Sequence, residues 1–224
     1  EIDQCLVGSE MCIRDSIHST TDGDDLIAFM ARVSNPSNQS NKQTAPKLIN
    51  YLIKHNHWSP FEMVSMCVQI ETTRSVAAQI LRHRSFSFQE FSQRYAEAQS
   101  PTIPNLRRQD YNNRQNSIDD LNPSEVGYFQ LQIEQLNSQS FYLYKQMLKA
   151  GVAKECARDV LPLSTPTTLY MHGTLRSWYH YISLRSDVST QKEHRLVATA
   201  CKDLIAKYFP QCYVAMFDHE VRSS

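Results

Sequence analysis

The stretch that decides the fold is residues 62–72, Glu62-Met63-Val64-Ser65-Met66-Cys67-Val68-Gln69-Ile70-Glu71-Thr72. Large apolar side chains occupy every second position along it, at Val64, Met66, Val68 and Ile70. This period of two is typical of a strand with one face in a core and the other outside it. Such one-sided burial is common in antiparallel sheets. The sequence therefore predicts an antiparallel sheet with this strand as its most clearly marked member.

Helical periodicity flanks the strand on both sides. Upstream, apolar residues recur at helical spacing from Asp24, where Asp24-Asp25 can cap the segment, and again over Lys47–His55. Downstream, Arg74–Arg84 returns to a helical pattern. Further along, we expect a second strand over Thr167–Met171 and a helix over Leu175–Leu184.

Two further helices carry capping signals. Asn122-Pro123-Ser124-Glu125 opens the longest helix, with Asn122 as the cap and Pro123 in the first turn, and Gly151 ends it. Thr190-Gln191-Lys192-Glu193 reads as a capping box for the last helix, which should end before Pro210. The long helix has an apolar stripe that we expect to be buried: Val126, Phe129, Ile133, Leu136, Leu143 and Met147.

These elements predict one α+β domain over residues 17–224, with a central antiparallel sheet packed by helices, one of them long. Within it, Asn105–Asp120 is rich in polar residues and predicts a long exposed excursion. Residues 1–16 resemble the translation of a transposon-end sequencing adapter, which would make them an artefact of sequencing. A natural irregular N-terminus is the alternative.

The overall composition excludes several classes of protein. The 224 residues carry 23 basic and 23 acidic side chains, so the net charge is zero, whereas a dedicated nucleic-acid-binding protein normally has a basic excess. No apolar run approaches the length of about 20 residues that crosses a bilayer. No Cys or His spacing matches a structural metal site, so we expect no metal. Scattered single cysteines indicate reduced thiols and a cytoplasmic location.

The cysteines offer no evident nucleophile. Cys67 lies in the predicted strand, Cys156 and Cys201 lie in helical stripes, and Cys212 follows a proline near the C-terminus. We expect each to be a buried structural residue rather than an activated thiolate.

Chemistry-bearing residues gather between positions 82 and 95. Arg82-His83-Arg84 ends a predicted helix, where cations are mildly stabilising, by about 0.3–1 kcal/mol, without any functional role. The following segment, Ser85–Tyr95, interleaves phenylalanines with Ser, Gln, Glu and Arg. Guanidinium groups suit phosphate oxygens, and amides and hydroxyls suit the edges of heterocyclic rings. The chain has only five glycines and no glycine-rich phosphate loop, so side chains must hold any nucleotide.

At this point the sequence resembles the flavin-dependent thymidylate synthases, whose signature is Arg-His-Arg, seven residues and a serine, here Arg82-His83-Arg84 and Ser92. Further segments match the family in order: Ala31-Arg32-Val33-Ser34, His57-Trp58-Ser59-Pro60-Phe61-Glu62, Arg158-Asp159-Val160-Leu161-Pro162, Arg176-Ser177-Trp178 and Leu184-Arg185-Ser186-Asp187. The resemblance spans about Asp24 to Phe217.

The resemblance implies the reductive methylation of dUMP to dTMP. Methylenetetrahydrofolate would donate the carbon, FAD would carry hydride and NADPH would be the reductant. It also implies a homotetramer whose active sites are built from several subunits.

It further implies roles for individual residues. Arg185 would be the catalytic residue, stabilising negative charge on the uracil as the N3 proton is lost. The cofactor-binding residues would be Ser34, His57, Ser59, Arg82, His83, Arg84, Glu90, Arg176 and His180. The dUMP-binding residues would be Gln79, Arg82, Glu90, Phe91, Ser92, Gln93, Arg94, Arg158 and Arg185. Gln93, Thr174 and His180 depart from the commoner family pattern, which leaves contacts to adenine and ribose open.

Two other interpretations remain. A nucleotide- or RNA-binding module would use the same Arg and Phe residues for phosphate contact and base stacking. A catalytically inactive paralogue would keep the fold as an assembly component.

Overall fold

The computed structural model describes residues 4, 5 and 12–218. Its centre is a five-stranded antiparallel sheet in the order β1-β2-β3-β7-β4. The strands are β1 (Gln4–Cys5), β2 (Cys12–Ser19), β3 (Ser65–Thr73), β7 (Pro166–Thr174) and β4 (Ser87–Glu90). The predicted α+β class with a central antiparallel sheet is confirmed. The interpretation of residues 1–16 falls partly outside the described residues and stays a prediction; residues 12–16 lie in β2.

The stretch that predicted the sheet forms its middle strand. β3 pairs with β7 from Ser65 opposite Thr174 to Thr73 opposite Pro166, and alternate side chains of β3 are fully buried. The predicted strand Thr167–Met171 lies within β7.

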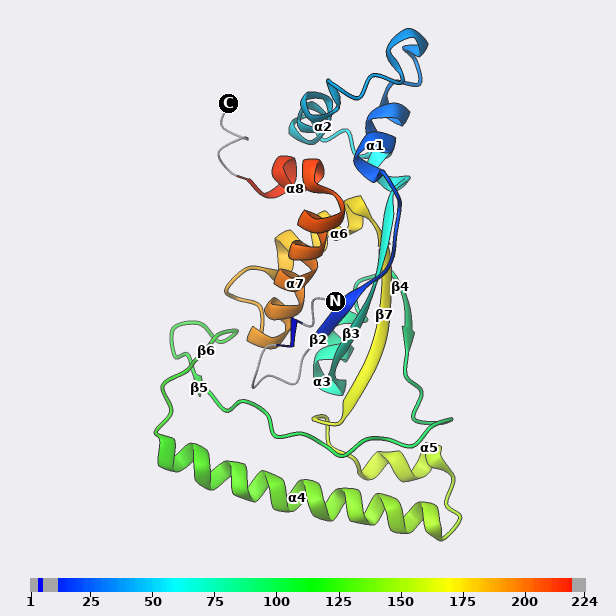
Figure 1. The fold of residues 1–224 in the computed structure, drawn as a ribbon. Helices are drawn as coiled ribbons and strands as arrows, with labels where there is room; N and C mark the ends of the chain where they lie inside the picture. The colour runs from blue at the N-terminus through cyan, green and yellow to red at the C-terminus, as the bar shows by residue number, and fades with distance from the viewer. Residues whose placement is uncertain (1–3, 6–11, 219–224) are drawn as a thin grey trace.

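Helices cover one side and both ends of the sheet (Figure 1). α6 (Leu175–Arg185), α7 (Lys192–Tyr208) and α8 (Pro210–Phe217) lie beside it, and α1 (Gly23–Ala31) and α2 (Ala45–Lys54) lie at one end. Trp178 of α6 is fully buried and donates from Nε1 to the Met66 carbonyl of β3 at 3.1 Å, which fixes the helix against the sheet.

Two capping predictions are wrong. Neither Asp24 nor Asp25 caps α1; the Asp24 carboxylate instead accepts the backbone N–H groups of Gln211 and Cys212 at 2.8 and 3.1 Å and so caps α8. Thr190 makes no cap bond to α7, and its hydroxyl instead donates to the Leu184 carbonyl at 3.5 Å. In both cases the side chain bonds to a segment outside the helix that it was expected to cap, and the local sequence does not show that partner.

The long helix α4 (Pro123–Lys149) crosses the other end of the sheet, followed by α5 (Lys154–Ala157) and the 3-10 turn η3 (Arg158–Val160) (Figure 1). Asn122 caps α4 by accepting from the Ser124 N–H at 3.0 Å, as predicted. The predicted buried stripe is wrong in part, because Phe129, Leu136 and Leu143 are at least half exposed. α4 buries Asn137 and Tyr144 instead, since it contacts the rest of the chain along a narrow face.

Remaining elements are short: the 3-10 turns η1 (Pro36–Asn38) and η2 (Ser59–Glu62), the helix α3 (Arg74–Ile80), and the strands β5 (Arg108–Gln109) and β6 (Ser117–Ile118). Over the described part of the chain, no helix is long and apolar enough to span a membrane. Residues 4, 5 and 12–218 likewise hold no group of three or more His, Cys, Asp or Glu side chains able to bind a metal.

The cysteine predictions hold for two residues. Cys201 and Cys212 are buried, and burial raises the pKa of both thiols, which disfavours the thiolate. Cys67 is half-buried, with its pKa also raised by burial. Cys156 is exposed, so its predicted burial is wrong.

Candidate active site

The triplet Arg82-His83-Arg84 lies in a turn after α3. The helix ends at Ile80, and the His83 N–H donates to the Ile80 carbonyl at 3.1 Å. The predicted helix over Arg74–Arg84 is therefore wrong for its last residues. Because the three side chains are not tied to helical spacing, they can face different partners.

Phe86 fixes this turn to the sheet. Its ring lies against Gly173 of β7, where an added Cβ would come within 2.4 Å of the ring, so only glycine admits Phe86 in this position. The Phe86 ring also packs edge-on to Trp178, with centroids 4.8 Å apart. The chain then enters β4, which pairs with β7.

Arg185, the last residue of α6, donates from Nε to Nε2 of His83 at 2.9 Å. Partial burial, Arg185 and Arg82 lower the pKa of His83 to about 4. His83 is therefore neutral near pH 7 and accepts this hydrogen bond. The expected catalytic residue and one expected flavin residue are thus brought together from segments far apart in the sequence.

A second histidine lies behind the first. His194 of α7 is fully buried, and its Nε2 lies 3.1 Å from the Tyr181 hydroxyl. The rings of His83 and Tyr181 meet edge-on at 4.9 Å. Burial, followed by Arg185 and His83, lowers the pKa of His194 to about 3, so this ring is also neutral. The two imidazoles therefore add no positive charge beside Arg185.

Three arginines near His83 have no acidic partner among the described residues. Within the described part of the chain, neither Arg82, Arg84 nor Arg185 forms an ion pair with a carboxylate. Arg82 and Arg84 are exposed, and Arg185 is half-buried. Uncompensated positive charge beside a neutral histidine favours an anionic ligand.

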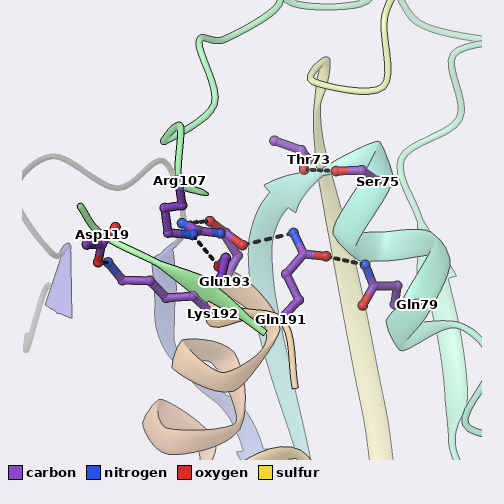
Figure 2. Close-up of polar contacts among 9 residues, drawn as sticks. Thr73, Ser75, Gln79, Arg107, Asp119, Gln191, Lys192 and Glu193 are labelled. Carbon is purple, nitrogen blue, oxygen red and sulfur yellow. Dashed lines mark hydrogen bonds and ion pairs between the residues drawn. The ribbon is translucent and has the colours of Figure 1, made fainter. Parts of the chain in front are cut away.

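Gln79 of α3 lies at the head of a chain of polar contacts (Figure 2). Its Nε2 donates to Oε1 of Gln191 at 2.5 Å, and Nε2 of Gln191 donates to Oε2 of Glu193 at 2.8 Å. Oε1 of Glu193 pairs with Nη1 of Arg107 at 2.6 Å. Arg107 belongs to the excursion that was predicted to be exposed, yet its side chain is only 9% exposed.

Glu90 and Phe91 lie beside a cavity of about 340 Å³ that is lined by Phe91, Glu71, Thr72, Gln99 and residues 166–168. Oε1 of Glu90 accepts from Thr167 at 3.0 Å and from Arg74 at 3.3 Å. The Glu90 carboxylate is thus held at the edge of the sheet. Phe91, the next residue, is the only expected dUMP-binding residue that lines this cavity.

The other residues expected to bind dUMP each have different neighbours. Gln93 is buried, and its Nε2 has no hydrogen-bond partner in the described part of the chain. Arg94 pairs with Glu155 at 3.1 Å on the surface, and Arg158 lies 4.0 Å from Asp159. Ser92 accepts from two backbone N–H groups through its carbonyl, which leaves its hydroxyl outside these turn bonds.

Expected cofactor residues form another group at the start of α6. Glu62 accepts from Arg176 and from Thr174, both at 2.8 Å. The bond from Arg176 is the main cause that lowers the pKa of Glu62. The His180 ring is tilted by 55° to the Trp58 ring, with centroids 5.4 Å apart, and burial lowers the pKa of His180.

The remaining expected residues lie apart from these groups. His57 is exposed near Tyr51 and His55, with ring centroids 6.0 and 6.1 Å away. Ser34 and Ser59 are exposed, Ser34 after α1 and Ser59 in η2. The single chain therefore unites His83 with Arg185 and Arg176 with His180, but it does not gather all expected residues in one cleft.

Sequence reasoning missed Arg107, Gln191, Glu193 and Glu62. Glu62 had a signal, because it is the last residue of the segment His57–Glu62 that resembles the family. The Gln79–Gln191 contact joins positions 112 residues apart, and the Arg107–Glu193 contact joins positions more than 80 apart, so no local pattern marks either of them.

Comparison with known proteins shows the family and the fold. The family described as "Thymidylate synthase complementing protein" matches residues 16–211. A probable flavin-dependent thymidylate synthase of Paramecium bursaria Chlorella virus 1 is 49% identical over 201 residues, covering 89% of this chain and 93% of that protein. A flavin-dependent thymidylate synthase of Synechocystis sp. is 50% identical over 191 residues, covering 85% and 88%.

A solved structure shares the fold. The UMP/dUMP methylase PolB from Streptomyces cacaoi, bound with 5-Br dUMP, superposes with a TM-score of 0.81 at 28% identity, covering 92% of this chain and 94% of that one. The sequence matches extend over nearly all the segments that form the site. The chain therefore belongs to the family of flavin-dependent thymidylate synthases.

Proposed function

We propose that this protein methylates dUMP to dTMP with methylenetetrahydrofolate as carbon donor, FAD as hydride carrier and NADPH as reductant. The observation that carries the proposal is the pair of Arg185 and neutral His83, flanked by arginines that have no carboxylate partner among the described residues. The bound nucleotide analogue named for PolB supports dUMP as the substrate.

The donor set fits an anionic dinucleotide. Arg82 and Arg84 offer exposed guanidinium groups to a pyrophosphate, and Arg176 with His180 offers further donors at the start of α6. Gln93, which we assign to dUMP and not to FAD, has a buried Nε2 without a partner among the described residues, so this donor needs an acceptor from a ligand. FAD, when bound, supplies hydride transfer, and Ser34, His57, Ser59, Arg82, His83, Arg84, Glu90, Arg176 and His180 are the residues we propose to hold it.

Arg185 would act on the uracil ring. Loss of the N3 proton places negative charge on the ring, and a fixed guanidinium facing that charge stabilises it. The bond to His83 uses Nε of Arg185, so its two terminal nitrogens stay available for the ring oxygens. His83 would therefore orient Arg185 without neutralising it.

The segment after β4 would hold the nucleotide. Glu90 is fixed by Thr167 and Arg74, next to the cavity lined by Phe91. Ser92, Gln93, Arg94, Arg158 and Gln79 complete the set that we propose to surround dUMP.

The dispersed site supports a homotetramer with shared active sites. Residues expected at one cofactor lie in separate groups of a single chain, so another subunit would have to complete each site. α4 exposes large apolar side chains, including Phe129, Leu136 and Leu143, which suit burial against another subunit. The cytoplasmic location expected from the cysteines stays a prediction.

Two measurements test the proposal. The purified protein should show a flavin absorption spectrum, and a colourless protein that FAD cannot reconstitute would contradict the enzyme. Tritium should be released from dUMP labelled at C5 only when NADPH and methylenetetrahydrofolate are both present. A flavin-loaded protein without release would instead indicate the inactive paralogue, and RNA binding without flavin would indicate the nucleic-acid module.

A further inference from the structure

We infer that Tyr181 of α6 and His194 of α7 are positioning residues for the proposed catalytic arginine. Their buried hydrogen bond fixes the Tyr181 ring, and this ring holds the His83 imidazole in the plane in which it accepts from Arg185. The inference rests on the proposed function, because that function gives Arg185 its role at the uracil. Tyr181 and His194 have no role in the proposed function itself.

Tyr181 and Arg185 contact the same imidazole. They lie four residues apart in α6, so their side chains leave the same face of the helix. The Tyr181 and His83 rings stand nearly at right angles, at 84°, with centroids 4.9 Å apart. Nε of Arg185 donates to Nε2 of His83 at 2.9 Å. One helix therefore holds His83 twice, through a ring that limits its tilt and a guanidinium that bonds to its edge.

The Tyr181 ring can hold its neighbour only if it is itself fixed. Its side chain is buried, and the one hydrogen bond of its hydroxyl among the described residues joins it to Nε2 of His194 at 3.1 Å. His194 is fully buried in the first turn of α7. The bond thus ties α6 to α7 across residues 186–191, the turn that begins directly after Arg185.

Stability does not explain the choice of this polar pair. Nδ1 of His194 is buried and has no hydrogen-bond partner in the described part of the chain, which costs free energy of folding. Two apolar side chains of similar shape would avoid that cost. Burial also keeps both groups uncharged, because it raises the pKa of Tyr181 and lowers the pKa of His194 to about 3. The pair therefore gives the Tyr181 ring a fixed direction and adds no charge beside Arg185.

The first test observes His83 without reference to activity. In nuclear magnetic resonance spectra of the ¹⁵N-labelled imidazoles, assigned with His83→Gln, the wild type should show His83 neutral and protonated on Nδ1, since Nε2 accepts from Arg185. The double variant Tyr181→Phe/His194→Leu keeps the space filled but removes the hydrogen bond. His83 should then show both neutral tautomers in exchange.

Tyr144 provides a matched control for this measurement. It is fully buried like Tyr181, and its hydroxyl also makes one hydrogen bond, from the Ala98 N–H at 3.0 Å. Tyr144 belongs to a separate apolar cluster beneath α4. Tyr144→Phe should therefore leave the His83 spectrum unchanged while it lowers the free energy of unfolding, because the Ala98 N–H loses its acceptor.

The second test measures tritium release by the flavin-loaded protein. Tyr181→Phe/His194→Leu should lower kcat by about three- to tenfold, while flavin content and the KM for dUMP change less than about twofold, since neither buried side chain is exposed to a ligand. His194→Gln, whose amide can still bond to the hydroxyl, should recover most of the rate. In a His83→Leu background the same double change should lower kcat less than about twofold, because the imidazole that the pair positions is absent.

A stability measurement separates positioning from general support of the core. The double variant removes both partners of the bond together with the unpaired Nδ1, so its free energy of unfolding in urea should equal or exceed that of the wild type. A slower enzyme of undiminished stability is the result expected for a positioning role. A loss of kcat that follows a loss of stability would overturn that role.

The remaining outcomes separate the two proposals. An unchanged His83 spectrum in the double variant would overturn the inference, and so would an equal loss of kcat with and without the His83 imidazole. If the double variant does not fold, Tyr181→Phe, which keeps the ring, is subjected to the same three measurements. A wild-type protein without tritium release contradicts the proposed function, and the spectra then still decide whether Tyr181 and His194 hold His83.

Discussion

Arg185 and His83 are joined by one hydrogen bond of 2.9 Å, from Nε of the guanidinium to Nε2 of the imidazole. A guanidinium only donates, so the proton of His83 must be on Nδ1. A protonated His83 could not accept this bond. The pair therefore links the charge state of His83 to the orientation of the proposed catalytic arginine.

Breaking the pair should slow catalysis. Arg185→Ala should lower kcat at least about 100-fold, in the range found when a transition-state donor is removed. His83→Leu, which cannot accept, should lower kcat about tenfold, and the double variant should be no worse than Arg185→Ala. Steady-state tritium release measures this, with His83→Gln as the control that retains an acceptor. Fully additive losses would show that His83 does not act through Arg185.

Stability should fall at mildly acidic pH. The pKa of His83 is about 4 in the folded chain and its ordinary value is 6.5, so between these values the unfolded chain binds the extra proton. His194, with a pKa of about 3, acts in the same direction. The free energy of unfolding should therefore decrease as pH falls from about 6.5 toward 4. Urea unfolding at several pH values measures this, and His83→Gln should show a weaker dependence. An identical dependence in His83→Gln would contradict the assignment.

Gly173 should tolerate no side chain. Gly173→Ala would place a Cβ 2.4 Å from the Phe86 ring and should lower the free energy of unfolding by about 1–3 kcal/mol. The matched control is Gly127→Ala, in the exposed part of α4 with no atom within 4 Å, which should raise stability by about 0.4–1 kcal/mol. Chemical denaturation of both variants measures the difference, and effects of equal sign would contradict the close packing.

Asp24 should stabilise α8 from a distance. Asp24→Ala removes the acceptor of two backbone N–H groups and should cost about 0.5–2 kcal/mol. Its neighbour Asp25 forms a surface ion pair with Lys42 at 2.7 Å, so Asp25→Ala should cost less than about 1 kcal/mol. Hydrogen exchange of the amides over Pro210–Phe217 should increase in Asp24→Ala only. Unchanged protection there would refute the cap.

The sequence alone determined the elements whose signals are local. Alternation every second residue marked β3 because one face of a strand lies in the core, and Asn122 marked the start of α4 because its cap bond reaches only two residues ahead. The ordered family motifs, from Ala31 to Asp187, determined the family without any coordinates.

Only the tertiary structure decided which partners these residues meet. Asp24 caps α8 across 187 residues, Gln79 meets Gln191 across 112, and His83 meets Arg185 across 102. The exposed side of α4 and the buried Arg107 also departed from their local patterns, because burial depends on which segment packs opposite. Contacts between residues so far apart in the sequence depend on how the whole chain folds. Periodicity and most helix caps depend on only a few neighbouring residues.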